Sequence, residues 1–309
     1  MMPAVAVHNL LKQYKNGKDT IEAVRGVSFE VEAGSIFGII GPDGAGKTSL
    51  FRMLTTLLLP DGGNASVDGS DIVKDYKALR KKLGYMPGKF SLYQDLTVEE
   101  NLNFFATIFN TSVEENYSLI RDIYVQIEPF KKRNAGKLSG GMKQKLALCC
   151  ALIHKPVVLF LDEPTTGVDA VSRKEFWDML QNLKNQGITI LVSTPYMDEA
   201  SQCTEVALMQ NGKIMTSGTP MEIRQNFKPT ILAVRSQNMY QLLQDLSASN
   251  EVDDVYSYGE YHHAVMKENY SNESLLRYLE SKGNINIDMH PVKPSIEDCF
   301  MQLMQNKHE

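Results

Sequence analysis

Strand-like and helix-like patterns of apolar residues alternate along the first three quarters of the chain. Residues 24–32 largely alternate apolar and polar side chains, which is typical of a strand with one buried face. Short apolar runs predict buried strands at 35–40, 157–161 and 188–192. Helical patterns lie between and after them, at 47–58, 138–153, 172–184 and 197–202. Strands that alternate with helices predict an α/β fold built in layers.

The pattern changes near residue 228. Beyond it the predicted order is strand, helix, strand, strand, helix, strand, at 231–235, 239–246, 252–257, 262–267, 273–280 and 285–290. This βαββαβ order predicts a small α+β domain of the split βαβ type, and a last helix follows it at 295–304. We therefore expect two domains, at 1–228 and 229–309.

Composition supports a globular chain. Of the 309 residues, 43% are apolar and 22% are charged, which excludes a disordered or collagen-like chain. The 37 acidic residues outnumber the 32 basic ones, and the net charge of −5 argues against a nucleic-acid partner. The 4 cysteines form no CxxC pair, so we expect reduced thiols in a cytosolic chain.

The sequence contains no candidate membrane span. Its apolar stretches fall far short of the ~20 residues that a transmembrane helix needs. Residues 1–11 lack the basic region and apolar core that mark a signal peptide. We therefore expect the chain to meet a membrane through a partner.

A phosphate-binding loop is predicted at 41–48. The sequence there, Gly-Pro-Asp-Gly-Ala-Gly-Lys-Thr, fits G-x-x-x-x-G-K-[ST] between an apolar strand and a helix. Glycines let successive backbone N–H groups turn toward one anion, and the helix N-terminus adds its positive end. We expect Lys47 to reach the outer phosphates and Thr48 to ligate Mg²⁺. An ordinary glycine-rich turn is the alternative, but it explains neither Lys47 nor Thr48.

Two carboxylates, Asp162 and Glu163, follow the apolar run at 157–161. In open α/β sheets the carboxyl ends of the strands face the ligand crevice. We expect Asp162 to hold Mg²⁺ directly or through water, and Glu163 to orient and polarise the attacking water. A polar strand end or a helix cap is the alternative for these two residues taken alone.

A third motif makes the interpretation specific. Leu138-Ser139-Gly140-Gly141 resembles the LSGGQ signature of ATP-binding cassette (ABC) proteins, with Met142 in place of the usual glutamine. Residues 167–169 resemble the D-loop of that family, and Tyr14 lies where the family places an aromatic residue against adenine. This resemblance covers residues 3–225. Residues 294–300 resemble the C-terminal extension of cassette subunits in drug-type exporters.

The resemblance implies a P-loop NTPase fold of the ABC cassette type, a RecA-like core with antiparallel β and helical subdomains. It implies that two cassettes pair head to tail, as a homodimer or heterodimer, with each ATP between one phosphate loop and the other chain's signature. Ser139, Gly140 and Gly141 then act on the partner's ATP, although Ser139 also fits a simple helix cap. The residues implied to bind ATP are Tyr14, Gly41, Asp43, Gly44, Ala45, Gly46, Lys47, Thr48 and Ser49, with Thr48 and Asp162 as Mg²⁺ ligands and Glu163 as the catalytic base.

The family implication for function is an ATP-hydrolysing subunit of an ABC transporter that powers export through separate permease subunits. Such a chain is cytoplasmic and lies on the inner face of the cell membrane through its permease. In this family the permease docks on the stretch equivalent to residues 85–119. Its apolar residues here, such as Leu92, Leu96, Phe104 and Phe105, are candidates for that surface, and each also fits core packing. Residues 229–309 are expected to regulate or stabilise the dimer, by analogy only.

Two positions depart from the family pattern. Gly88 stands where the family usually has a glutamine, and Gln94 is not at the matching position. Pro195 stands where the family usually has a histidine that contacts the γ-phosphate, and proline offers neither an N–H nor a titratable group. Either this site turns ATP over slowly or not at all and lends its signature to a complete partner cassette, or Glu163 still supports useful hydrolysis with Gln94 or water covering the losses.

Two other functions remain as alternatives. A non-hydrolysing, ATP-binding regulatory partner of a complete cassette fits Gly88 and Pro195. A translation or DNA-repair factor of the same family fits less well. Those relatives usually carry two cassettes in one chain or a long coiled coil. We expect neither feature in this sequence.

Overall fold

The computed structural model describes residues 2–17 and 19–305, which form two compact units. The first unit extends to Pro220 and the second begins at Met221, whereas the sequence predicted a boundary near 228. The short helix α7 (Pro220–Gln225) falls at this division. Its buried Ile223 accepts a hydrogen bond from Cys299 Sγ at 3.7 Å, which ties most of the helix to the second unit. Within the predicted ranges 1–228 and 229–309, Met1, Lys18 and residues 306–309 lie outside the described residues.

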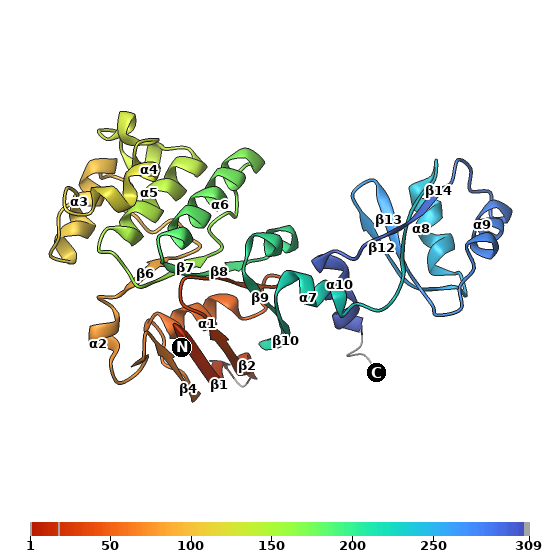
Figure 1. Cartoon of the computed structure of the whole chain (residues 1–309), viewed down its shortest axis with the longest axis horizontal. Coiled ribbons are helices and arrows are strands. Elements are labelled where there is room, and N and C mark those ends of the chain that lie inside the picture. The colour runs from red at the N-terminus through yellow and green to blue at the C-terminus, as the bar shows by residue number, and fades with distance from the viewer. Residues whose placement is uncertain (1, 18, 306–309) are drawn as a thin grey trace. The chain divides into compact units, whose positions relative to one another are not determined.

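A six-stranded sheet carries the buried strands of the first unit (Figure 1). β10 is antiparallel to β9, and all other neighbouring strands are parallel. Every residue of β3, β7 and β8 is buried, which explains their apolar character. The carboxyl ends of these three strands therefore lie at one edge of the sheet. The strand order is β10 (Lys213–Gly218), β9 (Glu205–Gln210), β3 (Ile36–Ile40), β8 (Thr189–Thr194), β7 (Val158–Asp162) and β6 (Leu83–Met86).

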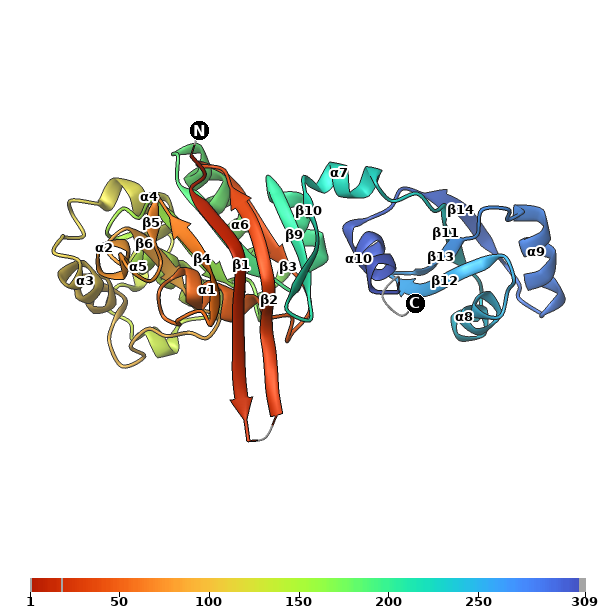
Figure 2. The same ribbon diagram turned by 90° about the horizontal axis from the view of Figure 1, so that it is seen from below.

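An antiparallel sheet forms the second layer of this unit, and its strands β1 and β2 make the long ribbon in Figure 2. Helix α1 (Lys47–Leu54) packs against both sheets, and the Phe51 and Phe160 rings meet edge to face at 5.7 Å. The helix ends earlier than the predicted 47–58 because Thr56 has a φ of +64°. The order in the sheet is β2 (Asp19–Val31), β1 (Val5–Asn16), β4 (Gly62–Val67) and β5 (Ser70–Asp71).

Helices α3, α4 and α5 gather into a helical part of the first unit (Figure 1). The predicted helix 138–153 is α5, whereas the predicted helix 197–202 is a 3₁₀ helix, η3. In the part of the chain that the structure describes, no helix has the length and apolar character needed to cross a bilayer. The bounds are α2 (Tyr76–Leu79), α3 (Val98–Ile108), α4 (Tyr117–Tyr124), α5 (Gly140–Leu152), α6 (Ala170–Asn185), η1 (Glu128–Phe130), η2 (Ala135–Lys137) and η3 (Met197–Gln202).

The second unit has the predicted βαββαβ order, and this prediction is confirmed. Its strands form one antiparallel sheet in the order β12-β13-β11-β14. One face, including Leu232, Val234 and Ala264, packs against α8 and α9. The elements are β11 (Ile231–Arg235), α8 (Met239–Ser247), β12 (Val252–Tyr258), β13 (Tyr261–Met266), α9 (Asn272–Ser281), β14 (Asp288–Val292) and the final helix α10 (Ile296–Gln305).

A buried carboxylate fixes α10 to this sheet. Asp298 is fully buried and accepts hydrogen bonds from His263 Nδ1 at 2.8 Å, Tyr256 Oη at 2.6 Å and the Ser295 backbone N–H at 2.5 Å. Burial alone would raise the pKa of Asp298, but these bonds outweigh it and hold the pKa below its usual value of 3.8. The helix is therefore held by a charged group rather than by apolar contact alone.

Asp298→Ala is expected to free α10 from the second unit. The substitution leaves the buried His263 and the half-buried Tyr256 without their acceptor, which costs about 3 kcal/mol. Hydrogen–deuterium exchange over Ile296–Gln305 should speed up about 100-fold. The Asp298 contribution is present above pH 3.8 and is lost as the pH falls through the lower native pKa. The exposed Asp253→Ala is the control, and equal exchange in both variants would contradict the prediction.

Candidate nucleotide site

The predicted phosphate loop joins β3 to the first turn of α1. Gly44 and Gly46 have φ angles of +79° and +103°, which favour glycine. A Cβ at Gly41 would collide with the Met209 carbonyl oxygen, and one at Gly46 with the Ala23 carbonyl oxygen. The loop therefore requires glycine for its shape, and its backbone runs into the N-terminus of an eight-residue helix. That arrangement is suited to binding an anion.

Lys47 spans this loop from the first position of α1. Its side chain is 3% exposed, and Nζ donates to the carbonyl oxygens of Gly41 at 2.8 Å and Pro42 at 3.0 Å. The same ammonium forms an ion pair with Glu163 Oε1 at 3.1 Å. A phosphate that reaches Lys47 must therefore compete with the Glu163 carboxylate. The sequence predicted both residues for one site, and the structure brings them into contact.

Thr48 and Asp162 form the second contact across the site. Thr48 Oγ1 donates to Asp162 Oδ1 at 3.2 Å, and Asp162 is 2% exposed. A hydroxyl and a carboxylate are hard oxygen donors, and Mg²⁺ typically takes few protein ligands while keeping several waters. The pair therefore fits the predicted Mg²⁺ site.

Ser193 is a residue of this site that the sequence analysis missed. It lies in β8, is fully buried, and donates from Oγ to Asp162 Oδ1 at 2.5 Å. The Glu163 backbone N–H donates to Ser193 Oγ and to the Ser193 carbonyl oxygen, each at 3.0 Å. The sequence places the Ser193 hydroxyl near the end of a predicted strand. It does not show that this strand pairs in parallel with the strand of Asp162, and only that pairing brings the two residues together.

Several further predicted residues lie around the loop. Tyr14 Oη and Ser49 Oγ are 3.1 Å apart, so the predicted adenine-contacting ring lies beside α1. Ala45 is buried, and its carbonyl oxygen accepts from the Gly212 N–H at 3.0 Å, which anchors the loop to the β9–β10 turn. Asp43 and Gly44 are exposed at the tip.

The predicted signature begins α5. Ser139 is the N-cap, and its Oγ accepts from the Met142 N–H at 3.4 Å, so the capping interpretation is confirmed. Ser139 and Gly140 are exposed, which leaves this helix start open to a ligand. Within residues 2–17 and 19–305, no hydrogen bond or ion pair joins Ser139, Gly140 or Gly141 to the phosphate loop of the same chain.

Gly88 and Pro195 are the two positions that depart from the family pattern. Gly88 lies against Asp162 and Glu163, and Pro195 lies at the end of β8. A Cβ at Gly88 would lie 3.0 Å from the Asp162 carbonyl oxygen and 3.7 Å from Glu163 Cβ, so position 88 borders Asp162 and Glu163. The Gln94 carbonyl oxygen instead accepts from the Gly136 N–H at 2.9 Å, just before the signature. Pro195 directly follows β8.

This fold and this set of contacts define a P-loop nucleotide-binding protein. Comparison with known proteins gives the family. Residues 24–166 match the ABC transporter family, and residues 218–304 match the C-terminal domain of ATP-binding proteins like DrrA1-3. The solved structure of cbiO1 from Clostridium perfringens, part of the ABC transporter complex cbiONQ, has a TM-score of 0.64 at 26% identity, covering 73% of this chain and 92% of that chain. The expected cassette fold is confirmed.

Two curated relatives extend the match beyond the cassette. The probable multidrug ABC transporter ATP-binding protein YbhF of Escherichia coli (strain K12) is 40% identical over 98% of this chain and 53% of its own length. The Nod factor export ATP-binding protein I of Burkholderia thailandensis is 31% identical over 94% of this chain and 95% of its own length. The chain belongs to the family of ABC transporter ATP-binding proteins. It spans about half the length of YbhF.

Lys47→Ala is expected to weaken ATP binding about 30-fold. The substitution removes the one buried ammonium on the described part of the loop, and a hydrogen bond to a charged group contributes about 2 kcal/mol. Titration calorimetry with ATP and Mg²⁺ measures the change. Lys74→Ala, an exposed lysine of the same unit, is the control, and equal affinities of the two variants would contradict the assignment of Lys47.

Proposed function

We propose that the chain binds ATP with Mg²⁺ and hydrolyses it to power export through separate permease subunits. The observation that carries the proposal is the meeting of Lys47, Thr48, Asp162 and Glu163 at the carboxyl ends of β3 and β7. Membership of the ABC transporter ATP-binding family supports it. The names of the relatives, multidrug for YbhF and Nod factor export for the Burkholderia protein, support export as the direction.

The residues of the chain supply the steps of hydrolysis. Lys47 and the loop N–H groups hold the β- and γ-phosphates, which releases Glu163 from its ion pair. The freed Glu163 carboxylate accepts a proton from water as the water oxygen attacks the γ-phosphorus. The bond from that phosphorus to the bridging oxygen then breaks, giving ADP and phosphate. Thr48 and Asp162 would hold Mg²⁺, which would neutralise charge on the phosphate oxygens when bound.

The site of this chain is weakened by Gly88 and Pro195. Gly88 offers no side-chain oxygen or N–H beside Asp162, and Pro195 offers no side-chain group to a γ-phosphate. Glu163 nevertheless remains in contact with Lys47, so the central reaction groups are retained. The proposal is therefore slow hydrolysis at this site, with a non-hydrolysing regulatory role as its alternative.

A second cassette completes the site. The exposed start of α5 at Ser139 and Gly140 offers backbone N–H groups that suit a γ-phosphate on a partner chain. The dimer is a homodimer or pairs this chain with a complete cassette. In the second case this chain contributes its signature to the partner's ATP even where its own turnover is slow. The second unit regulates or stabilises that dimer.

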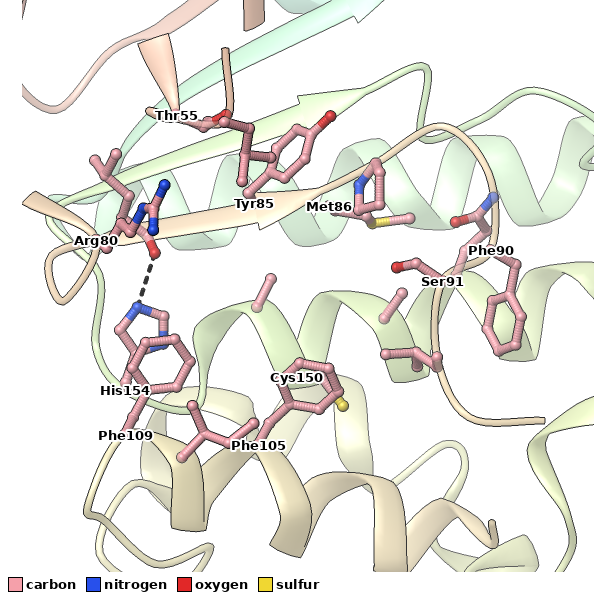
Figure 3. Close-up of a pocket in the computed structure, with 18 residues that line it drawn as sticks. Thr55, Arg80, Tyr85, Met86, Phe90, Ser91, Phe105, Phe109, Cys150 and His154 are labelled. Carbon is pink, nitrogen blue, oxygen red and sulfur yellow. Dashed lines mark hydrogen bonds between the residues drawn. The ribbon is translucent and has the colours of Figure 1, made fainter. Parts of the chain in front are cut away.

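A groove on the first unit is the proposed permease-docking site (Figure 3). It has a volume of about 390 Å³ and is lined by apolar side chains including Phe105, Ile108 and Phe109. Of the four apolar residues predicted for docking, Leu92 and Phe105 line the groove, whereas Leu96 and Phe104 are not among its lining residues. A permease that docks here would hold the chain on the inner, cytoplasmic face of the membrane.

His154 is a half-buried polar side chain that lines the groove. His154 donates from Nε2 to the Leu83 carbonyl oxygen at 2.9 Å and stacks on Phe109 at 3.8 Å. Burial lowers the pKa of His154, so its ring is neutral. The other ring nitrogen, Nδ1, is buried and has no hydrogen-bond partner among the described residues. A permease segment with an apolar face suits this groove.

ATP turnover by the purified chain tests the proposed enzyme. The wild type should turn over ATP with Mg²⁺, and Glu163→Gln should lose at least about 100-fold in rate while still binding ATP. Assays at protein concentrations that span dimerisation separate a weak dimer from an inactive site. If neither protein turns over ATP that it binds, the chain is the regulatory partner of another cassette.

Pro195→His tests whether the weakened site limits that rate. A histidine at this position restores a group that can contact the γ-phosphate, so turnover should rise about 10-fold or more. Position 195 is the cleaner choice because a Cβ at Gly88 would press on the Asp162 carbonyl oxygen at 3.0 Å. Unchanged turnover would show that position 195 does not limit the rate.

Ile108→Glu tests the docking groove. Ile108 is 54% exposed and lines the groove, so a buried charge there should disrupt an apolar interface. Recovery of the chain with membranes that contain its permease should fall about 10-fold or more, while ATP affinity stays unchanged. Val125→Glu, at 48% exposure outside the groove, is the matched control. Equal loss in both variants would contradict docking at this groove.

A further inference from the structure

Ser193 links the strand β8 to the Asp162 carboxylate and to the backbone N–H of Glu163. We propose that Ser193 is a positioning residue for ATP turnover, whose hydroxyl sets the geometry of Asp162 and Glu163. This inference rests on the proposed ATP-binding and hydrolysing function. It gives β8 a role in the site, although Pro195, the residue after this strand, stands where the family usually has a histidine that contacts the nucleotide.

The direction of the hydrogen bonds at Ser193 is fixed by chemistry. An ionised carboxylate only accepts, so Ser193 Oγ gives its single proton to Asp162 Oδ1 at 2.5 Å. The lone pairs of the same oxygen then accept the Glu163 N–H at 3.0 Å. The hydroxyl thus connects the carboxylate of one residue to the backbone of the next. With 0% exposure, it meets no competing bulk water.

Ser193 also determines which oxygen of Asp162 faces the metal site. Thr48 Oγ1 donates to Asp162 Oδ1 at 3.2 Å, so both hydroxyls share Oδ1 and neither takes Oδ2. Oδ2 is therefore left for a metal ion or a metal-bound water. Mg²⁺ demands nearly ideal octahedral geometry, so a rotated carboxylate weakens its hold. Groups that orient metal ligands in this way typically change metal affinity or activity 10–100-fold.

The backbone at Glu163 needs this support as well. Glu163 has a φ of +50°, an uncommon conformation for a residue other than glycine. Its N–H bonds to both the Ser193 carbonyl oxygen and Ser193 Oγ hold that conformation from the neighbouring strand. Loss of the hydroxyl leaves one of the two bonds. The Glu163 carboxylate then lies in a less defined position for the attacking water.

The test compares Ser193→Ala with the wild type in two measurements. The first is the Mg²⁺ concentration at which ATP binding is half-saturated, which needs no turnover. The second is the kinetics of hydrolysis. For Ser193→Ala we expect the Mg²⁺ requirement to rise about 10-fold and kcat to fall about 10-fold. At saturating Mg²⁺, KM for ATP should stay within about 2-fold because Lys47 and the loop are unchanged.

Two further variants separate positioning from general loss of structure. Ser193→Thr keeps the hydroxyl and should restore the Mg²⁺ requirement to within about 3-fold of the wild type. Thr194→Val is the matched control, since Thr194 is also fully buried and donates to a carboxylate, Glu199, at 2.5 Å. It should leave the Mg²⁺ requirement unchanged. An equal shift in Thr194→Val and Ser193→Ala, or no shift in Ser193→Ala, would overturn the proposal.

The outcome also distinguishes this inference from the proposed function. If the wild type binds ATP with Mg²⁺ but does not hydrolyse it, hydrolysis is wrong and the Mg²⁺ requirement still decides the role of Ser193. If the wild type hydrolyses ATP and Ser193→Ala matches it in both measurements, only the role of Ser193 is wrong. If ATP binding by the wild type does not depend on Mg²⁺, both are wrong.

Discussion

The buried ammonium of Lys47 is the interaction on which the nucleotide site depends. It is 3% exposed, and a charge in that position is stable only when it is paired and hydrogen-bonded. Two loop carbonyls and Glu163 satisfy it in the structure. The loop shape, the first turn of α1 and the end of β7 are therefore coupled through one side chain. In the proposed mechanism, a phosphate would replace Glu163 as the partner of Lys47, and the Glu163 carboxylate would then be free to accept a proton from water.

The proposed loss of two groups that are usual in the family leaves the central contacts of the site in place. Position 88 borders Asp162 and Glu163, and position 195 directly follows β8. Neither change removes a contact to Lys47, Thr48 or Glu163. Ser193 keeps β8 connected to Asp162 despite Pro195. These retained contacts are consistent with the proposed ATP binding and slow hydrolysis.

The sequence was sufficient for the parts of the fold that depend on local pattern. The apolar runs at 35–40 and 157–161 correspond to β3 and β7. The βαββαβ order of the second unit was also predicted correctly. The glycines and Lys47 could be assigned because each has a local steric or charge requirement. The end of α1 was missed because apolar residues continue to Leu58 while Thr56 turns the backbone to a positive φ.

Contacts between distant segments could not be read in the same way. Ser193 meets Asp162 only because β8 and β7 pair in parallel register, with Asp162 opposite Ser193. The buried Asp298 resembles a polar residue on a helix surface until His263 and Tyr256 are seen to donate to it. Likewise, the division after Pro220, within α7, agrees with the contact of Ile223 with Cys299, which no local pattern contains.

A structure of the chain with a non-hydrolysable ATP analogue and Mg²⁺ tests the central claim most directly. The account predicts that Lys47 Nζ lies within hydrogen-bond distance of the β- or γ-phosphate and that Thr48 Oγ1 ligates Mg²⁺. It also predicts that the 3.1 Å contact between Lys47 and Glu163 is broken. A bound nucleotide that leaves this ion pair intact, or that places its phosphates away from Lys47, would contradict the account.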